Sequence, residues 1–181
     1  MQDKELFSLI LDPDEEVVKV MRPNKGRAWF SSIFTLVILG IFFLPASIVS
    51  FFDAELGVWS GIWFLLIYLV FVAITITMMV LWLNKTVYAI TNKRILIRTG
   101  YIGVDYKSLD FHMVGALTVN VNWIDKLLKK NTGSIAFGSM ASPMVNNNVA
   151  KFNFSFISNP YEIYKEIKGT IDAHKNVDNK N

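Results

Sequence analysis

The sequence from Ala28 to Phe52 reads AWFSSIFTLVILGIFFLPASIVSFF, and the sequence from Leu56 to Leu83 reads LGVWSGIWFLLIYLVFVAITITMMVLWL. Neither stretch contains a charged residue. A helix needs about 20 apolar residues to cross the hydrocarbon core of a bilayer. Both stretches exceed that length, and soluble cores seldom contain two uncharged helices of this size. The sequence therefore predicts two transmembrane helices in an integral membrane protein.

The residues that flank the two stretches predict their orientation. The connection is only Asp53-Ala54-Glu55, so the helices are expected to form an antiparallel hairpin. Basic residues lie before the first stretch and after the second: Lys19, Arg22, Lys25, Arg27, Lys85, Lys93, Arg94 and Arg98. Cytoplasmic flanks carry an excess of Lys and Arg, so both termini are expected on the cytoplasmic side of the membrane.

The overall composition agrees with a membrane anchor joined to a small domain. Charged residues make up 18% of the chain, against roughly 25% in soluble domains. There are no cysteines, which excludes disulfides and thiolate metal sites. The first 27 residues are polar and partly acidic, so no cleavable signal peptide is expected. Residues 84–181 carry 13 Lys and Arg against seven Asp and Glu, and such a basic domain attracts anionic headgroups.

After Leu83 the hydrophobic pattern changes to the alternation of β-strands. Thr86–Ile90 and Ile95–Thr99 flank the turn-forming sequence Thr91-Asn92-Lys93-Arg94, which predicts a β-hairpin. Further candidate strands are Tyr106–Phe111, Val114–Val121, Gly133–Phe137 and Val149–Ile157. In the last of these, alternation with polar residues places three rings on one face: Phe152, Phe154 and Phe156.

The end of the chain predicts a helix. Asn159-Pro160 combines a capping residue with a proline suited to the first helical position. Apolar residues then recur at helical spacing: Tyr164, Ile167 and Ile171. Several antiparallel strands followed by one amphipathic helix indicate a small sheet or barrel that the helix closes.

Four stretches resemble bacterial pleckstrin-homology-like membrane proteins of the YdbS/YdbT-like type. The first is YAITNKRILIRTGYIG at Tyr88–Gly103, and its most specific piece is Thr91-Asn92-Lys93-Arg94 at the first hairpin. The others are DPDEEVVKVMRP at Asp12–Pro23, WIDKLL at Trp123–Leu128 followed by TGSIAF at Thr132–Phe137, and NPYEIYKEI at Asn159–Ile167. The resemblance implies a seven-stranded, partly open β-barrel capped by the C-terminal helix, and it implies no activity.

The predicted fold is therefore a membrane-anchored α+β protein. A two-helix transmembrane hairpin is joined to a PH-like antiparallel β-barrel that a C-terminal α-helix closes. The expected divisions are a cytoplasmic segment at 1–27, the hairpin at 28–83 with spans 28–52 and 56–83, a cytoplasmic PH-like domain at 84–175, and a disordered tail at 176–181.

The first candidate site is the basic cluster of Lys93, Arg94 and Arg98. In PH folds, the first hairpin is a common phosphoinositide-binding position, and a β-turn with two cations can bind one phosphate. The spacing departs from the usual pattern, because Arg94 and Arg98 lie four residues apart on one face. We favour the alternative that these residues are solvated beside the anionic leaflet and contribute about 1 kcal/mol each to membrane attraction.

The second candidate site interleaves an aromatic residue with cations: Trp123, Lys126, Lys129 and Lys130. This segment could lie on lipid or on a partner as a short amphipathic turn. We favour the alternative that Trp123, with Leu127 and Leu128, caps the barrel, because apolar residues at helical spacing are usually core.

The sequence contains no recognisable catalytic motif. His112 and His174 are the only histidines and lie far apart in the chain, and no metalloprotease, P-loop, nucleophile-elbow or dinucleotide motif occurs. The acidic cluster Asp12–Glu16 could hold a cation, but a solvated turn is favoured. We expect no catalytic residues, no metal, no cofactor and no nucleic-acid partner.

The first hypothesis is a non-catalytic, membrane-anchored PH-like interaction module at the cytoplasmic face. It would bind membrane lipids or a protein partner, with strand addition at a sheet edge as the mode of protein binding. A second copy of the chain is a further candidate partner. The alternative is an accessory subunit of a transport or envelope-stress and antimicrobial-resistance complex, in which small residues such as Gly40, Ser47 and Gly61 pack against other membrane helices.

Overall fold

The computed structural model describes residues 5–53, 57–127, 131–139 and 152–178. The chain divides into two compact units. The β unit combines Met1–Asn24 with Lys85–Asn181, and the helical unit is Lys25–Asn84. The N-terminal residues, expected as a separate segment, therefore belong to the same unit as the residues that follow the helices. The reason is a β-strand near the N-terminus that the sequence analysis did not identify.

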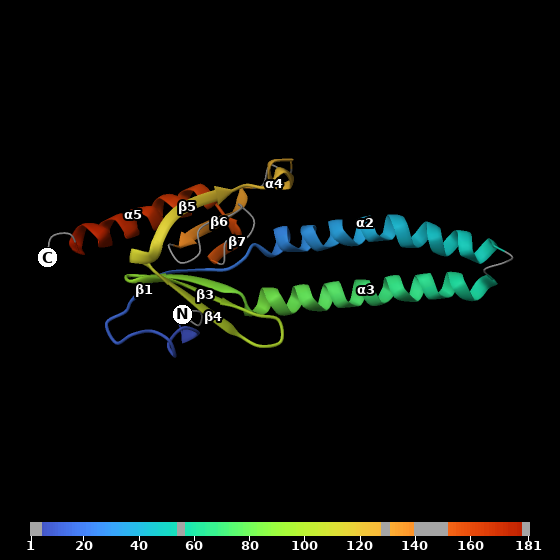
Figure 1. Cartoon of the computed structure of the whole chain (residues 1–181), viewed down its shortest axis with the longest axis horizontal. Helices are drawn as coiled ribbons and strands as arrows, with labels where there is room; N and C mark the ends of the chain where they lie inside the picture. Colours follow the sequence, from blue (N-terminus) through green and yellow to red (C-terminus); the bar gives the residue numbers. More distant parts are fainter. Residues whose placement is uncertain (1–4, 54–56, 128–130, 140–151, 179–181) are drawn as a thin grey trace. The chain divides into compact units, whose positions relative to one another are not determined.

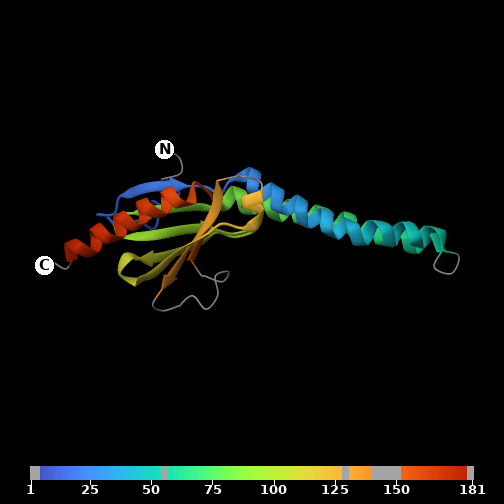
Figure 2. The same ribbon diagram turned by 90° about the horizontal axis from the view of Figure 1, so that it is seen from above.

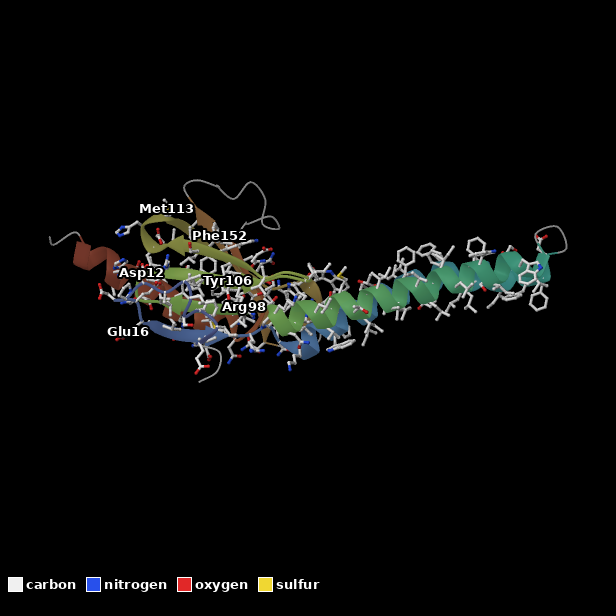
Figure 3. All side chains as sticks on the ribbon, turned by 90° about the horizontal axis from the view of Figure 1, so that it is seen from below. Asp12, Glu16, Arg98, Tyr106, Met113 and Phe152 are labelled. Atoms are coloured by element: carbon white, nitrogen blue, oxygen red, sulfur yellow. The ribbon has the colours of Figure 1, made fainter. Side chains whose placement is uncertain are left out.

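The helical unit consists of α2 (Lys25–Phe52, 28 residues) and α3 (Gly57–Lys85, 29 residues), which run side by side in Figure 1. Their bounds agree closely with the predicted spans. Both helices are long and apolar enough to cross a membrane. Large apolar side chains are exposed along both helices, including Phe42 and Trp63, and Figure 3 shows side chains projecting along their length.

Small residues allow the two helices to approach closely. The Ser47 hydroxyl donates a hydrogen bond to the Gly61 carbonyl at 3.0 Å. A Cβ atom on Gly61 would lie 2.8 Å from the Phe51 ring and 2.9 Å from the Ser47 carbonyl oxygen. A Cβ atom on Gly40 would lie 3.1 Å from the Tyr68 hydroxyl oxygen. These residues, which we had considered for packing against other membrane helices, therefore pack within the hairpin itself.

The described residues of the β unit form seven strands in two antiparallel sheets. The first sheet has the order β1-β2-β3-β4 and the second the order β5-β6-β7. The strands are β1 (Val17–Met21), β2 (Val87–Thr91), β3 (Arg94–Thr99), β4 (Asp105–Asp110), β5 (Val114–Asn120), β6 (Thr132–Ser139) and β7 (Phe152–Ser158). All the predicted strands are present in this set; residues 149–151 of the last one lie outside the described residues. The addition is β1, which pairs with β2 in antiparallel register.

The two sheets do not close into a barrel, which corrects the expectation drawn from the family resemblance. The chain leaves β4 through a short 3₁₀ turn, η1 (Phe111–Met113), before β5 begins. In the described residues β4 pairs only with β3, and β1 pairs only with β2. Near the other junction, the Asn24 amide donates to the Phe156 carbonyl at 2.6 Å, but the residues that the structure describes form no strand ladder there.

The main core lies between the two sheets and the C-terminal helix α5 (Pro160–Asp178). Figure 2 shows α5 running across the strands. Apolar residues of all three layers are buried together, among them Tyr88, Ile95, Phe137, Phe154 and Ile167. The predicted apolar face of α5 is confirmed by the burial of Ile167 and Ile171. The helix extends to Asp178, into the segment expected to be a tail.

The aromatic alternation in the last strand is interrupted. Phe154 is fully buried and Phe152 packs against the core, as predicted. Phe156 has a φ of 55°, and its neighbour Ile157 occupies the next buried position instead. The pairing of β6 with β7 shifts register between Gly133 and Ile135, so a bulge, rather than regular alternation, decides which side chains face the core.

A second apolar cluster covers the opposite face of the first sheet. Val87, Ala89 and Leu96 point to this face, whereas Tyr88 and Ile95 point to the main core. Phe7, close to the N-terminus, is fully buried in this second cluster. The first sheet is thus apolar on both faces, and the N-terminal residues complete the β unit by covering one of them.

Candidate functional site

Arg94, predicted as a phosphate or membrane ligand, is paired with a buried carboxylate. The Arg94 Nη2 atom lies 2.7 Å from Oε2 of Glu15, and its Nε atom donates to Glu15 Oε1 at 3.0 Å. The Glu15 side chain is fully buried, and Thr91 Oγ1 donates to its Oε1 atom at 2.6 Å. The backbone amide of Asp12 donates to Oε2 at 3.1 Å. The Arg94 guanidinium group is therefore already bound to a carboxylate of the same β unit in a bidentate arrangement.

The same contacts keep both groups charged. Burial raises the pKa of Glu15, but hydrogen bonds from Arg94, Thr91 and the Asp12 amide, together with the charge of Arg94, outweigh it and lower the pKa below 4.5. The hydrogen bond to Glu15 raises the pKa of Arg94, although its partial burial opposes that change. The pair therefore stays ionised at neutral pH and links the N-terminal segment to β3.

The turn between β2 and β3 is held by the same N-terminal segment. The Asn92 side-chain oxygen accepts from the Glu16 amide at 3.1 Å, and the Asn92 amide donates to the Glu16 carbonyl at 3.1 Å. The Lys93 carbonyl accepts from the Phe111 amide at 3.2 Å. The acidic segment is thus only partly the solvated turn we favoured, because Glu15 is an internal partner of the hairpin.

Arg98 lies on the same face of β3 as Arg94 but has a different internal contact. Its Nη1 atom donates to the carbonyl of Lys85, the last residue of α3, at 3.1 Å. Leu96 lies between the two arginines and is buried. Figure 3 labels Arg98 beside Tyr106, the residue opposite it on β4. The two arginines therefore bind different internal acceptors, and the role of Lys93, Arg94 and Arg98 in membrane or partner binding remains a prediction.

The second predicted cluster lies on a short helix, α4 (Trp123–Leu127). Trp123 is 60% exposed, so it does not cap the core, and Lys126 is exposed as well. Between them, Asp125 is buried and accepts a hydrogen bond from Thr132 Oγ1 at 2.6 Å, which ties α4 to β6. Lys129 and Lys130 lie outside the described residues. The binding role of this cluster also remains a prediction.

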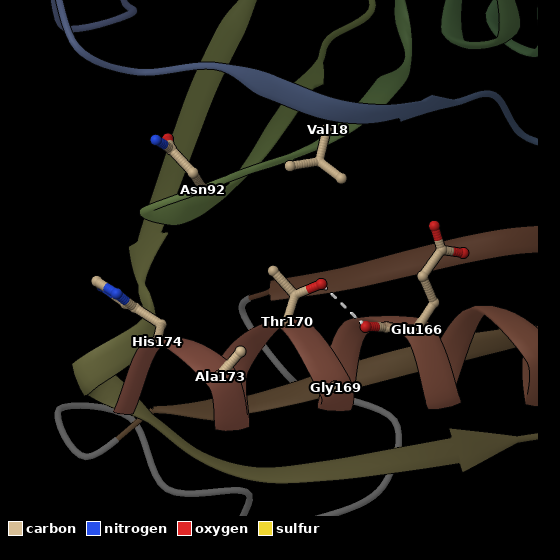
Figure 4. Close-up of a pocket in the computed structure, with 7 residues that line it drawn as sticks. All are labelled: Val18, Asn92, Glu166, Gly169, Thr170, Ala173 and His174. Atoms are coloured by element: carbon tan, nitrogen blue, oxygen red, sulfur yellow. Dashed lines mark hydrogen bonds between the residues drawn. The ribbon is translucent and has the colours of Figure 1, made fainter. Parts of the chain in front are cut away.

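A groove of about 560 Å³ lies between β1 and α5, and Figure 4 shows it. The groove is shallow and wide open, and most of its exposed lining is carbon. Four of the residues that line it have polar side chains, Asn92, Glu166, Thr170 and His174, and the others are Val18, Gly169 and Ala173. Val18 is 52% exposed and lies where the pairing of β1 with β2 shifts register. Because of this bulge, the Val18 side chain lies on the side of the sheet that faces α5 (Figure 4). We call this feature the α5 groove.

Polar contacts border the α5 groove. Glu166 forms a salt bridge with Lys19 of β1, which joins the helix to the edge strand. At the other end, the ring of His174 lies 5.5 Å from the ring of Phe111 and 5.2 Å from that of His112. The two histidines, distant in sequence, are thus neighbours. Even so, the described residues contain no group of three or more acidic, histidine or cysteine side chains that could hold a metal ion.

A smaller groove of about 230 Å³ lies between α5 and β5. Its lining is Val114, Gly115, Leu117, Tyr164, Lys168, Ile171 and Asp172. Both grooves adjoin strands at the edge of a sheet, since β1 ends the first sheet and β5 ends the second. Sequence reasoning missed both grooves, because each is lined by segments that are distant in the chain and carry no recognisable motif.

A comparison with protein families supports the resemblance seen in the sequence. The family model described as "Bacterial PH domain" matches residues 26–170 of this chain. Comparisons with curated proteins and with solved structures each gave no match. The family match covers most of the 181 residues, including both helices, all strands after β1 and the first half of α5.

Proposed function

The chain belongs to the bacterial PH-domain family, and on that premise we propose that it is a non-catalytic, membrane-anchored module that binds a protein partner in the α5 groove. The helical unit would span the cytoplasmic membrane, and the β unit would lie on its cytoplasmic side. The single observation that carries the proposal is the apolar α5 groove beside the edge strand β1.

The surface of the helical unit supports the membrane anchor. Large apolar side chains are exposed on both helices, and their extent far exceeds the apolar patches found on soluble monomers. Lipid tails would cover this surface without further protein. The basic residues that flank the helices favour a cytoplasmic location for both ends of the chain. The alternative role as a subunit of a larger membrane complex receives no comparable support, because Gly40, Ser47 and Gly61 already pack within the hairpin.

The edge of β1 supports strand addition as the mode of binding. An edge strand carries backbone amides and carbonyls that can pair with an extended peptide. Val18 and the surface of α5 would contact alternate side chains of that peptide, and the polar residues at the rim would fix its position. The anionic membrane surface remains a second possible ligand of the basic β unit, but the pairing of Arg94 with Glu15 removes one of the cations it would use.

Gly169 gives a further reason to regard the groove as a binding surface. Glycine inside a helix is less stable than alanine by about 1 kcal/mol. A Cβ atom on Gly169 would meet no other atom within 4 Å, so internal packing does not require the glycine. Its effect is to leave the helical wall of the groove open, where a peptide backbone could lie close to the helix.

The proposal is tested by filling the groove in the full-length protein in native membranes. A fragment that begins at residue 84 would lack β1 and the cover provided by Phe7, so it is unsuitable. Gly169→Leu would place a large side chain in the groove, whereas Gly169→Ala would add only a methyl group that meets no other atom within 4 Å. Lys165→Leu is a matched control on an exposed site of α5 outside the groove lining.

Photo-crosslinking from Thr170, followed by mass spectrometry, would identify proteins that occupy the groove. We expect Gly169→Leu to abolish a crosslink that Gly169→Ala and Lys165→Leu retain. Equal crosslinking in all three variants, with the β unit folded in each, would contradict the proposed groove. Hydrogen exchange of the β2 and β3 amides would confirm that the β unit is folded.

A further inference from the structure

The loop between β3 and β4 exposes apolar side chains. Residues 100–104 read GYIGV. Ile102 is 86% exposed, and Tyr101 and Val104 are exposed as well. The loop contains no charged residue. Three exposed apolar side chains in one uncharged loop have no role in the core of the β unit.

The backbone of this loop is held in a defined conformation. Gly100 has a φ of +153°, and a Cβ atom there would lie 2.3 Å from the Gly103 carbonyl oxygen. Glycine is therefore required for the tight approach of the two ends of the loop. The Lys85 ammonium group donates to the Ile102 carbonyl at 2.5 Å and lies 3.4 Å from the Gly103 carbonyl. These contacts present the apolar side chains on the outside.

The contact with Lys85 determines where the loop would lie in a membrane. Lys85 is the last residue of α3 and belongs to the same compact unit as the loop. Lysine at the cytoplasmic end of a spanning helix places its ammonium group at the headgroup level. Because the loop backbone accepts a hydrogen bond from that ammonium group, the loop would lie at the same depth.

We infer that Tyr101, Ile102 and Val104 form a membrane-contacting surface that inserts into the headgroup region of the cytoplasmic leaflet. This inference rests on the proposed spanning of the membrane by α3. A tyrosine beside aliphatic residues suits this region, where an apolar body and a polar tip are both solvated. Lipid is the occupant because the loop backbone is hydrogen-bonded to Lys85, the residue that would meet the headgroups at the end of a spanning α3.

Single-cysteine labelling tests the inference, because the natural chain contains no cysteine. Full-length Ile102→Cys, Met113→Cys and Phe71→Cys variants would carry an environment-sensitive fluorophore in nanodiscs of zwitterionic and anionic phospholipids. Met113 is a matched, exposed apolar control at the opposite end of β4, separated from the loop by roughly 17 Å of strand. Phe71 reports on α3 itself.

Lipids that carry a spin label at headgroup level or deep in the acyl chain would quench fluorophores at the corresponding depth. We expect the fluorophore at position 102 to show blue-shifted emission and stronger quenching by the shallow label, and the one at 113 to show neither. Emission at 102 that matches 113 would overturn the inference, as would a blue shift without lipid quenching, which indicates contact with protein. Deep quenching at position 71 would show that α3 spans the membrane. Its absence would overturn both the spanning of the membrane by α3 and the membrane-contacting loop.

Discussion

Removal of the Glu15 carboxylate is expected to destabilise the β unit strongly. In Glu15→Ala, Arg94 loses its bidentate partner, with contacts of 2.7 and 3.0 Å, and Thr91 loses its 2.6 Å acceptor. Breaking a buried ion pair by removing one partner costs about 3–5 kcal/mol. Here the Arg94 side chain is 20% exposed and retains two internal partners, the Ile10 carbonyl at 2.9 Å and the Asp12 carboxylate at 3.4 Å, so these acceptors and water partly replace Glu15. We therefore expect a loss of about 2–3 kcal/mol.

Hydrogen exchange of the full-length protein in nanodiscs can measure this loss locally. The amides of β2 and β3 report the free energy of opening of the first sheet, which the Glu15–Arg94 ion pair links to the N-terminal segment. Glu16→Ala is a matched control, because Glu16 is adjacent and exposed, and it should change the opening free energy by less than about 0.5 kcal/mol. The backbone contacts of residue 16 with Asn92 remain in both variants.

A second comparison separates the ion pair from general loss of packing. Replacing both partners with leucine removes the buried charge together with its counter-charge, so it should cost less than Glu15→Ala alone. Equal opening free energies in Glu15→Ala and Glu16→Ala would contradict a stabilising role for the Glu15 carboxylate. A double substitution that cost as much as the two single substitutions added together would mean that the two groups do not interact.

Three further outcomes are expected. Because the folded-state pKa of Glu15 is lowered from 4.5, its stabilising effect should be present above pH about 4.5 and be lost as the pH falls through the lowered value; exchange measured against pH should show this step in the natural protein and not in Glu15→Gln. Gly61→Ala should loosen the helical hairpin, because its Cβ would lie 2.8 Å from the Phe51 ring and 2.9 Å from the Ser47 carbonyl oxygen. Gly40→Ala should loosen it less, because its Cβ would lie 3.1 Å from a side-chain hydroxyl. Cysteine crosslinking between α2 and α3 would rank the two variants, and equal crosslinking in both would contradict this packing. Burial raises the pKa of Tyr88 to about 12, despite its hydrogen bonds with Ser155, so the β unit should lose stability as the pH rises above about 10; ultraviolet titration should show a late phenol that Tyr88→Phe removes, and its persistence in that variant would exclude Tyr88 as the source.

Several elements could be predicted because the properties that define them are local. The lengths of α2 and α3 follow from uninterrupted apolar stretches, and the burial of Ile167 and Ile171 follows from helical spacing in α5. The β2–β3 hairpin was also predicted, because its turn residues and flanking alternation lie within a dozen residues. The candidate site was less predictable. Lys93, Arg94 and Arg98 were identified as a basic cluster, but nothing near them in the sequence indicated that Glu15 would neutralise Arg94.

Neighbouring residues set the hydrophobic periodicity, so the two long apolar helices, the succession of strands and the amphipathic C-terminal helix can be derived from the sequence. Three features follow only from the folded structure: β1 pairs with β2 although the helical unit separates them in the sequence, the sheets remain open, and β1 and α5 border a groove. Those features depend on which segments meet after the chain folds. The short strand Val17–Met21 has little local signal of its own, and the residues of β2 that pair with it, 67 to 74 positions away in sequence, supply the hydrogen bonds that define it.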